Sequence, residues 1–159
     1  MTDRSFTVTF IVDQTPDAVF KAVINVRGWW SEAIEGATDH AGGVFWYHFQ
    51  DLHRCTMQVT ELTPGRKVVW RVLDNYFSFT KDSREWTGTG ITFDIAAKGD
   101  KTELRFTHHG LVPEEECYAA CSDGWGTYIT KSLRDLIVTG KGNPNVGAAV
   151  TETERALVG

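Results

Sequence analysis

The side chain whose sequence position is best suited to chemistry is His108. It alternates with Leu104 and Phe106 along a predicted strand, which places all three on the same inward face. A histidine in an apolar cavity can act as a general base or offer a hydrogen bond to a ligand. The other interpretation is a core histidine whose ring nitrogens are satisfied near the strand end. The neighbouring His109 points the opposite way, toward solvent.

The three cysteines offer two further kinds of chemistry. Cys117 and Cys121 are four residues apart, so on a helix both thiols share one face and could ligate a metal ion together with His108. The pattern has no C-x-x-C pair and no clustered histidines, which favours buried thiols, and no metal is expected. A Cys–His nucleophile is the remaining option, although no local group activates a thiol. Cys55 has no neighbouring His or Asp and is interpreted as core.

Two carboxylates, Glu85 and Asp94, are nearest to a possible cavity opening. Acid–base catalysis by paired carboxylates requires both groups inside the cavity. Asp94 falls on the outward face of its strand and Glu85 is in a loop, so both are expected to be solvated. The glycines at 42–43 and 88–90 precede strands rather than helices, so they do not predict a phosphate-binding loop.

Residues 74–87 hold four aromatic side chains in a stretch otherwise too polar for a core: Tyr76, Phe77, Phe79 and Trp86. The segment is longer than an ordinary hairpin loop. One hypothesis is that it forms an aromatic flap at the mouth of a cavity. The alternative is that two strands run longer, with the rings packed on the sheet or on a partner chain.

A long amphipathic helix is predicted over 113–140, because proline and three glutamates open it and an apolar stripe follows at three- and four-residue steps. The stripe consists of Cys117, Cys121, Trp125, Tyr128, Ile129, Leu133, Leu136 and Ile137. Gly124 and Gly126 weaken its middle, so we expect a bend there, or two helices meeting at Ser122 and Asp123.

Most of the chain before this helix alternates between apolar and polar residues, as strands do. The exceptions are a helix from Pro16 to Gly28, capped by Thr15, and a short ambiguous segment at 31–34. This order predicts an α+β domain over 1–145, followed by a loosely ordered tail at 146–159. In that domain a curved antiparallel sheet of about six or seven strands wraps around the C-terminal helix, two short helices follow the first strand, and a cavity lies between sheet and helix.

Composition narrows the function. The chain has 159 residues, of which 42% are hydrophobic and 23% charged, as expected for one folded domain. The net charge is −5 and the Lys and Arg residues are scattered, so the basic stripe of a nucleic-acid binder is missing from the sequence. No apolar run approaches the roughly 18 residues of a membrane span. The N-terminus has no signal-peptide pattern, which predicts a cytoplasmic protein.

Several local segments stand in a characteristic order: PDAVFKAV at 16–23, Trp29-Trp30, LTPGRKVVWRV at 62–72, GTGITFDI at 88–95, TELRFTHHGL at 102–111 and GWGTYITKSLRDLIVTGKGNP at 124–144. With the order of elements, they resemble the helix-grip fold of the START-like, or SRPBCC, superfamily, and they are most similar to the branch homologous to the activator of the heat-shock-protein-90 ATPase. The resemblance covers about residues 5–145. It implies an internal hydrophobic cavity, no obligate metal or cofactor, no universal catalytic residue and a link to the stress response. A single domain of this length departs from the eukaryotic co-chaperone, which carries an additional N-terminal domain.

The sequence thus predicts binding of a small hydrophobic molecule between the sheet and the C-terminal helix. The predicted lining consists of Met57, Trp70, Trp86, Phe93, Phe106, His108, Trp125 and Tyr128. One alternative is a cyclase or hydrolase that uses His108 as its base. Another is a module that contacts a chaperone through the outer face of the sheet. No cofactor, nucleic acid or membrane span is expected, and the protein is predicted to be a monomer or a homodimer.

Overall fold

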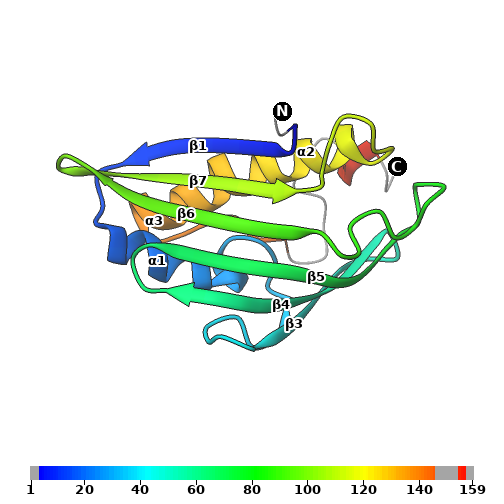
Figure 1. Ribbon diagram of the computed structural model, residues 1–159, viewed down its shortest axis with the longest axis horizontal. Coiled ribbons are helices and arrows are strands. Elements are labelled where there is room, and N and C mark those ends of the chain that lie inside the picture. Colours follow the sequence, from blue (N-terminus) through cyan, green and yellow to red (C-terminus); the bar gives the residue numbers. More distant parts are fainter. Residues whose placement is uncertain (1–3, 146–153, 157–159) are drawn as a thin grey trace.

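The computed structural model describes residues 4–145 and 154–156 (Figure 1). Its N-terminal half contains β1 (Phe6–Val12), α1 (Pro16–Ile24), the 3₁₀ turn η1 (Val26–Gly28), β2 (Glu35–Gly36), β3 (Val44–Phe49) and β4 (His53–Thr63). It continues with β5 (Lys67–Phe77), β6 (Gly90–Lys98), β7 (Lys101–His109), α2 (Tyr118–Thr127), the π-helical segment η2 (Tyr128–Leu133) and α3 (Arg134–Thr139).

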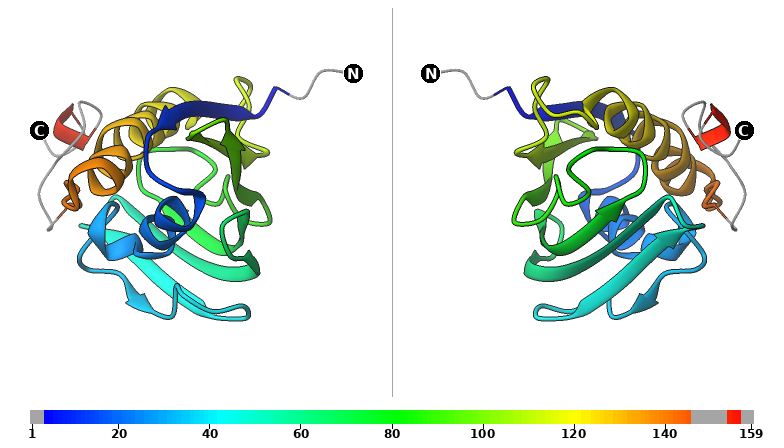
Figure 2. Two further views of the ribbon diagram at one scale, coloured as in Figure 1. Left: turned by 90° about the vertical axis from the view of Figure 1, so that its left-hand side faces the viewer. Right: turned by 90° about the vertical axis from the view of Figure 1, so that its right-hand side faces the viewer.

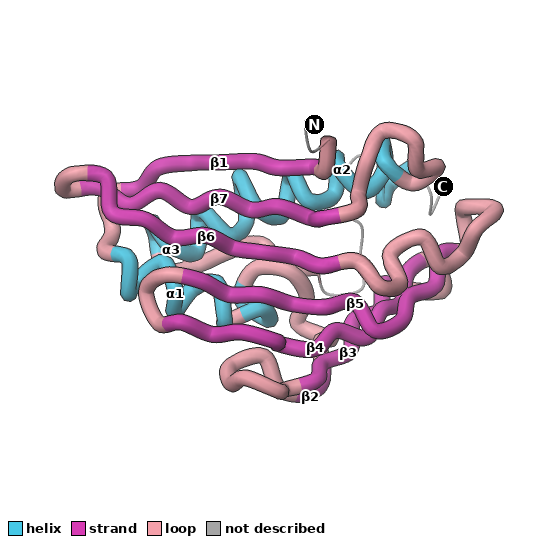
Figure 3. The backbone as a smooth tube through the Cα atoms, in the orientation of Figure 1, coloured by secondary structure: helices cyan, strands magenta, loops and turns pink. Residues whose placement is uncertain are grey.

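The seven strands form one antiparallel sheet in the order β1-β7-β6-β5-β4-β3-β2. Seen end-on, the sheet curves around the C-terminal helices, and α1 lies on the same concave side (Figure 2). The backbone trace shows the same two layers, with the helices behind the strands (Figure 3). The predicted α+β helix-grip architecture, its number of strands and the short helices after the first strand are therefore confirmed.

The curvature comes in part from irregular pairing between β4 and β5. The register shifts twice, and one shift leaves Leu73 of β5 without a paired residue in β4. Such a bulge bends the strand and moves its buried positions by one residue. In β5 the buried even-numbered series ends at Val72 and resumes at Asn75 and Phe77. Pairing of β5 with β6 extends only to Arg71, so the ends of β4 and β5 splay away from β6 beyond this point (Figure 1).

The C-terminal helical region differs from the prediction in where it begins and where it is irregular. It begins at Tyr118, because residues 113–117 form turns. Two helices do not meet at Ser122 and Asp123, since α2 runs through both glycines to Thr127, and the irregularity is the π-helical segment η2 that follows. The helix ends at Gly140 in a left-handed conformation, as the sequence predicts.

Of the predicted tail at 146–159, only 154–156 lie among the described residues, and they form a helical turn beside α2 (Figures 1 and 2). Within the described ranges, none of the helices is long and apolar enough to cross a membrane.

Candidate ligand pocket

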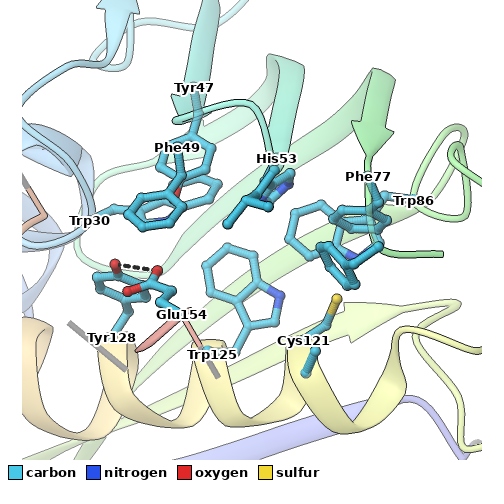
Figure 4. A pocket seen from close by; sticks show the side chains of 14 residues that line it. Trp30, Tyr47, Phe49, His53, Phe77, Trp86, Cys121, Trp125, Tyr128 and Glu154 are labelled. Carbon is cyan, nitrogen blue, oxygen red and sulfur yellow. Dashed lines mark hydrogen bonds between the residues drawn. The ribbon is translucent and has the colours of Figure 1, made fainter. Parts of the chain in front are cut away.

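A pocket lies between α2 and the splayed ends of β3, β4 and β5 (Figure 4). Its cavity measures about 70 Å³. The side chains that line it are mostly aromatic: Trp30, Tyr47, Phe49, Leu52, His53, Phe77, Phe79, Trp86, Ala120, Cys121, Gly124, Trp125, Tyr128 and Glu154.

The helical wall follows from the predicted apolar stripe. Cys121, Trp125 and Tyr128 recur at steps of four and three residues, which places them on one face of the helix. All three are buried, and Figure 4 shows them pointing toward the strands. The opposite wall consists of Tyr47 from β3 and His53 from β4, which lie on the inward faces of their strands.

Two pairs of stacked rings shape the pocket. Trp30 stacks on Tyr47 with ring centroids 4.2 Å apart and planes 19° apart. Trp86 stacks on Trp125 at 5.5 Å and 11°. Trp30 and Trp125 in turn contact each other at 4.9 Å, so the aromatic surface is continuous across the pocket. A continuous surface of aromatic rings favours a flat apolar ligand over a branched one.

Both interpretations of residues 74–87 are correct in part. Residues up to Phe77 continue β5, as the alternative proposed, and the chain then forms a loop that leads to β6. Phe77, Phe79 and Trp86 line the pocket as the flap hypothesis expects. Tyr76 does not, because it lies on the other face of β5, where it is 37% exposed and sits 4.8 Å from the Arg54 guanidinium.

His53 supplies the pocket with a buried nitrogen. Its ring contacts Tyr47 at 5.0 Å, Phe77 at 4.7 Å and Trp86 at 4.7 Å between centroids. Burial lowers the pKa of His53 to about 3, so the ring is neutral at physiological pH. Its Nε2 atom is buried and has no hydrogen-bond partner among the residues that the structure describes.

The opposite end of the pocket is polar. The Asn145 side-chain amide donates to the hydroxyl oxygens of Tyr47 (3.2 Å) and Tyr128 (3.1 Å). The Tyr128 hydroxyl donates to a carboxylate oxygen of Glu154 over 2.8 Å (Figure 4). Burial raises the pKa of both tyrosines well above the usual value, and the Glu154 carboxylate adds to the shift. Both hydroxyls therefore keep their protons at any physiological pH.

His108 lies outside this lining and is fully buried. Its Nδ1 accepts a hydrogen bond from Trp125 Nε1 (3.1 Å), and its Nε2 is 2.8 Å from Thr89 Oγ1. The Thr89 hydroxyl donates to the Trp86 carbonyl oxygen, so the His108 proton resides on Nε2. Burial, with smaller contributions from His109 and His53, lowers the pKa of His108 to about 3. The structure thus matches the interpretation of a satisfied core histidine.

Three of the eight predicted lining residues, Trp86, Trp125 and Tyr128, line the pocket. The other five lie in the core: Met57, Trp70, Phe93, Phe106 and His108 are all fully buried.

Only some of the lining residues that the prediction missed could have been found from the sequence. His53 continues the inward series of Cys55, Met57 and Val59, so extending that strand by one step would have found it. Tyr47 lies in a segment that is apolar at both parities, and alternation gives no face there.

Glu85 and Asp94, the two carboxylates considered in the sequence as possible acid–base groups, lie in different environments. Asp94 lies on the outer face as predicted, 3.9 Å from Lys67 Nζ. The expectation that Glu85 is simply solvated is wrong, because its carboxylate accepts hydrogen bonds from the backbone N–H groups of Glu116 (2.9 Å) and Cys117 (3.0 Å). It thereby satisfies backbone donors just before α2, a role for which no sequence pattern exists at a separation of more than thirty residues.

The three cysteines are buried free thiols. Burial raises the pKa of Cys55 and Cys121, and a hydrogen bond with Cys117 adds to the shift at Cys121. Among the described residues, no three His, Cys, Asp or Glu side chains lie together in a group that could hold a metal ion.

A curved antiparallel sheet closed around a C-terminal helix, with a pocket between them, defines the START-like, or SRPBCC, class of proteins. Within that class the chain belongs to the family described as "Activator of Hsp90 ATPase homolog 1-like protein", which it matches over residues 13–137. The resemblance stated from the sequence is confirmed. A comparison with curated proteins finds no significant match.

Solved structures with the same fold come from several bacteria. The solution structure of the Aha1 dimer from Colwellia psychrerythraea superposes with a TM-score of 0.69 at 23% identity, covering 87% of this chain and 98% of that one. CalU16 from Micromonospora echinospora gives 0.60 at 15%, covering 85% and 76%. DynU16, from the dynemicin biosynthetic locus, gives 0.66 at 18%, covering 91% of this chain and 51% of that one. At these identities the likeness establishes the fold.

Proposed function

We propose that this protein binds a small, planar, apolar molecule in the pocket between α2 and the ends of β3–β5. The observation that carries the proposal is the combination of an aromatic lining with the buried Nε2 atom of His53, which lacks a partner among the described residues. Buried polar atoms are nearly always hydrogen-bonded, so an unsatisfied one inside a pocket favours a ligand that supplies the missing bond.

The size of the cavity limits the ligand or requires movement. A cavity of about 70 Å³ is well below the roughly 300–1,000 Å³ of typical ligand pockets. A ligand of ordinary size therefore displaces part of the lining. Phe79, in the β5–β6 loop, and Glu154, in the C-terminal turn, are lining residues outside the strands and the long helix.

Gly124 offers a direct test. A Cβ built at Gly124 has nothing within 4 Å, and the residue lines the pocket, so Gly124→Leu fills the cavity without a backbone clash. Gly126 is the matched control: it lies in the same helix, its Cβ also has nothing within 4 Å, and it is not a lining residue. Both substitutions improve helix propensity, so both variants are expected to fold.

The probe is the neutral fluorophore N-phenyl-1-naphthylamine, titrated into each protein, with native mass spectrometry of freshly purified samples alongside. We expect Gly124→Leu to weaken probe binding at least tenfold and to remove any co-purified small molecule, while Gly126→Leu matches the wild type. Equal binding by all three proteins, or by none, contradicts the proposal.

The enzyme alternative with His108 as base finds no support in this arrangement. Both ring nitrogens of His108 are engaged within the core, and the residue is not in the pocket lining. General-base catalysis needs a nitrogen within reach of the substrate proton.

A second function, contact with a chaperone of the Hsp90 type, is favoured by the family and by the outer face of the sheet. A groove there, of about 530 Å³, is lined by residues that include Trp46, Arg54 and Tyr76. The Trp46 and Tyr76 side chains in this groove are 50% and 37% exposed, and an exposed apolar patch of this kind is a candidate contact surface for a partner.

The test measures ATP hydrolysis by the Hsp90-type chaperone of the source organism with and without this protein. Stimulation that Trp46→Ser abolishes, and that falls at high salt, supports the second function. The absence of any effect on ATP hydrolysis by the wild-type protein excludes it. Sedimentation of the same samples distinguishes monomer from homodimer.

A further inference from the structure

Glu154 brings a carboxylate into a pocket that is otherwise apolar and neutral. Its Oε2 accepts the Tyr128 hydroxyl proton over 2.8 Å, and the residue is half-buried. The acid comes from the C-terminal turn at 154–156, separate from the strands and the long helix that supply most of the wall (Figure 4). The polar end of the pocket is therefore occupied by a side chain of the protein itself.

The hydrogen bonds behind Tyr128 run in one direction. The Ser31 hydroxyl accepts from the Ala33 backbone N–H (3.1 Å) and donates to Asn145 Oδ1 (3.0 Å). This fixes the Asn145 amide so that its NH₂ group faces Tyr128. Because the Tyr128 oxygen accepts from Asn145, its own proton is directed at Glu154.

The same amide directs a second hydroxyl. Tyr47 also accepts from Asn145, over 3.2 Å, and no acceptor for its proton is recorded within the described ranges. Ser31 and Asn145 are 0% and 1% exposed, so this polar framework is part of the core rather than of the surface. It is built to offer hydroxyl protons to an acceptor.

We propose that this end of the pocket is an oxyanion subsite and that the ligand is an aromatic carboxylic acid. In the unliganded protein the Glu154 carboxylate accepts the hydrogen bond of the Tyr128 hydroxyl, and the carboxylate of the ligand takes its place on binding. The inference rests on the proposed function and specifies its ligand class. The aromatic part of such a ligand lies against the continuous aromatic surface that the pairs Trp30–Tyr47 and Trp86–Trp125 form, with its edge toward His53 Nε2.

The position of Glu154 suits a ligand carboxylate better than the deeper, drier part of the pocket does. A carboxylate loses much of its hydration energy in a dry cavity, but Glu154 is only half-buried, so a group in its place keeps part of its contact with water. Hydroxyl-to-carboxylate hydrogen bonds are about twice as strong as those between neutral groups. Two carboxylates would repel each other in this space, so the ligand binds well only when Glu154 has left.

The experiment compares two probes of nearly equal shape, naphthalene-2-carboxylate and naphthalene-2-carboxamide, by calorimetric titration at pH 7.5. The proteins are the full chain, Glu154→Ala, the double variant Glu154→Ala with Tyr128→Phe, and Asp100→Ala. Asp100 lies in the exposed turn between β6 and β7, at the other end of the sheet, and its removal changes the net charge equally (Figure 1).

In Glu154→Ala we expect the affinity for the carboxylate to rise by roughly tenfold more than the affinity for the amide, the size of one charge-assisted hydrogen bond. Adding Tyr128→Phe is expected to remove that extra gain and to leave amide binding within about twofold. Asp100→Ala is expected to behave as the wild type toward both probes.

The outcomes separate this inference from the proposed function. An equal gain for both probes in Glu154→Ala means that Glu154 only fills space, which overturns the oxyanion subsite and keeps the pocket. A carboxylate gain that Tyr128→Phe leaves intact, or that Asp100→Ala reproduces, also overturns it. If neither probe binds any of the four proteins, both this inference and the binding function fail.

Discussion

Trp125 and His108 share a hydrogen bond that ties a wall of the pocket to the core. The indole Nε1–H donates to His108 Nδ1 over 3.1 Å, and the opposite ring nitrogen donates to Thr89. Thr89 in turn donates to the Trp86 carbonyl oxygen. A histidine outside the pocket therefore positions both members of the stacked pair Trp86–Trp125. His108 is a positioning residue for the site that the sequence expected it to enter.

Replacing His108 with phenylalanine is expected to lower the free energy of unfolding by roughly 2–4 kcal/mol, because the indole N–H of Trp125 and the Thr89 hydroxyl each lose a buried partner. Urea unfolding followed by tryptophan fluorescence measures the change. His108→Asn keeps an acceptor near the position of Nδ1, so it should lose less and should retain more probe affinity. If both variants are as stable as the wild type, the hydrogen bonds of His108 do not hold this wall in place.

The two buried histidines are expected to make the protein less stable as the pH is lowered from 7 toward 5, a window in which unfolded histidines gain protons. His53 and His108 have pKa values lowered to about 3 in the folded protein, chiefly by burial, against about 6.5 in an unfolded chain. Below 6.5 the unfolded state therefore binds more protons than the folded state, and the free energy of unfolding decreases. Urea midpoints at pH 7, 6 and 5 measure the slope.

Replacing His53 or His108 with a residue that does not titrate should remove its contribution, so the stability of each variant relative to the wild type should rise as the pH falls from 7 to 5. His40→Gln is the control for the loss of an exposed histidine. If the variants at positions 53 and 108 have the same pH slope as the wild type, the burial of neutral imidazoles is contradicted.

The fold could be predicted from the sequence because alternation and helical spacing report directly on which face is buried. Phe106 and Trp125 were both assigned correctly to inward faces in this way. What alternation does not report is depth. Phe106 packs against Phe93 at 5.2 Å in the filled middle of the sheet, whereas Trp86 and Trp125 lie where β5 has left β6. Alternation in the sequence marks core and pocket-lining side chains alike as inward-facing, and only the structure separates the two groups.

The pocket begins beyond the bulge at Leu73, where β5 leaves β6. In the sequence, the break in alternation at this residue predicts only the end of a strand. The contacts of Glu85 with the start of α2 and of Asn145 with two tyrosines have no local pattern at all, since they join distant parts of the chain. These side-chain hydrogen bonds define the polar end of the site and one edge of its mouth. They could be recognised only in three dimensions.

His53→Phe is expected to stabilise the protein by about 1 kcal/mol and to weaken binding of probes that hydrogen-bond. The substitution keeps a ring among Tyr47, Phe77 and Trp86 and removes a buried nitrogen that has no partner among the described residues. Thermal unfolding measures the stability, and titration with 2-naphthol and naphthalene measures the binding. The ratio of the two affinities should move toward naphthalene. A destabilised variant would show that Nε2 is satisfied in solution.

Glu85 fastens the β5–β6 loop to the start of α2. Its carboxylate accepts hydrogen bonds from the backbone N–H groups of Glu116 and Cys117, and Glu116 Oε1 in turn accepts one from the Lys81 backbone N–H over 2.8 Å. This loop carries Phe79 and Trp86 into the pocket. Glu85→Ala is therefore expected to speed amide hydrogen exchange in 78–89 and to raise probe association and dissociation rates together.

The hydrogen bonds of Glu85 near the start of α2 also bring the pKa of one carboxyl group, that of Glu115, close to neutrality. A hydrogen bond with Glu85, together with burial and the Glu85 charge, raises the pKa of Glu115 to about 7. Burial opposes ionisation of Glu85, but hydrogen bonds from Glu115 and from two backbone N–H groups outweigh it and lower the pKa of Glu85. Because folded Glu115 holds a proton that the unfolded chain has released, this pair destabilises the fold as pH rises from about 4.5 to 7.

Glu115→Gln is expected to remove that decline while keeping a donor for Glu85, so the variant should be more stable than the wild type at pH 8 and equal to it near pH 5. Glu32→Gln is the control, since it removes an exposed carboxylate that is not among the groups raising the pKa of Glu115. Urea midpoints at pH 5, 6.5 and 8 for the three proteins measure the difference. If Glu115→Gln tracks Glu32→Gln at every pH, Glu115 does not share its proton with Glu85, and the β5–β6 loop is held to the start of α2 by the backbone hydrogen bonds alone.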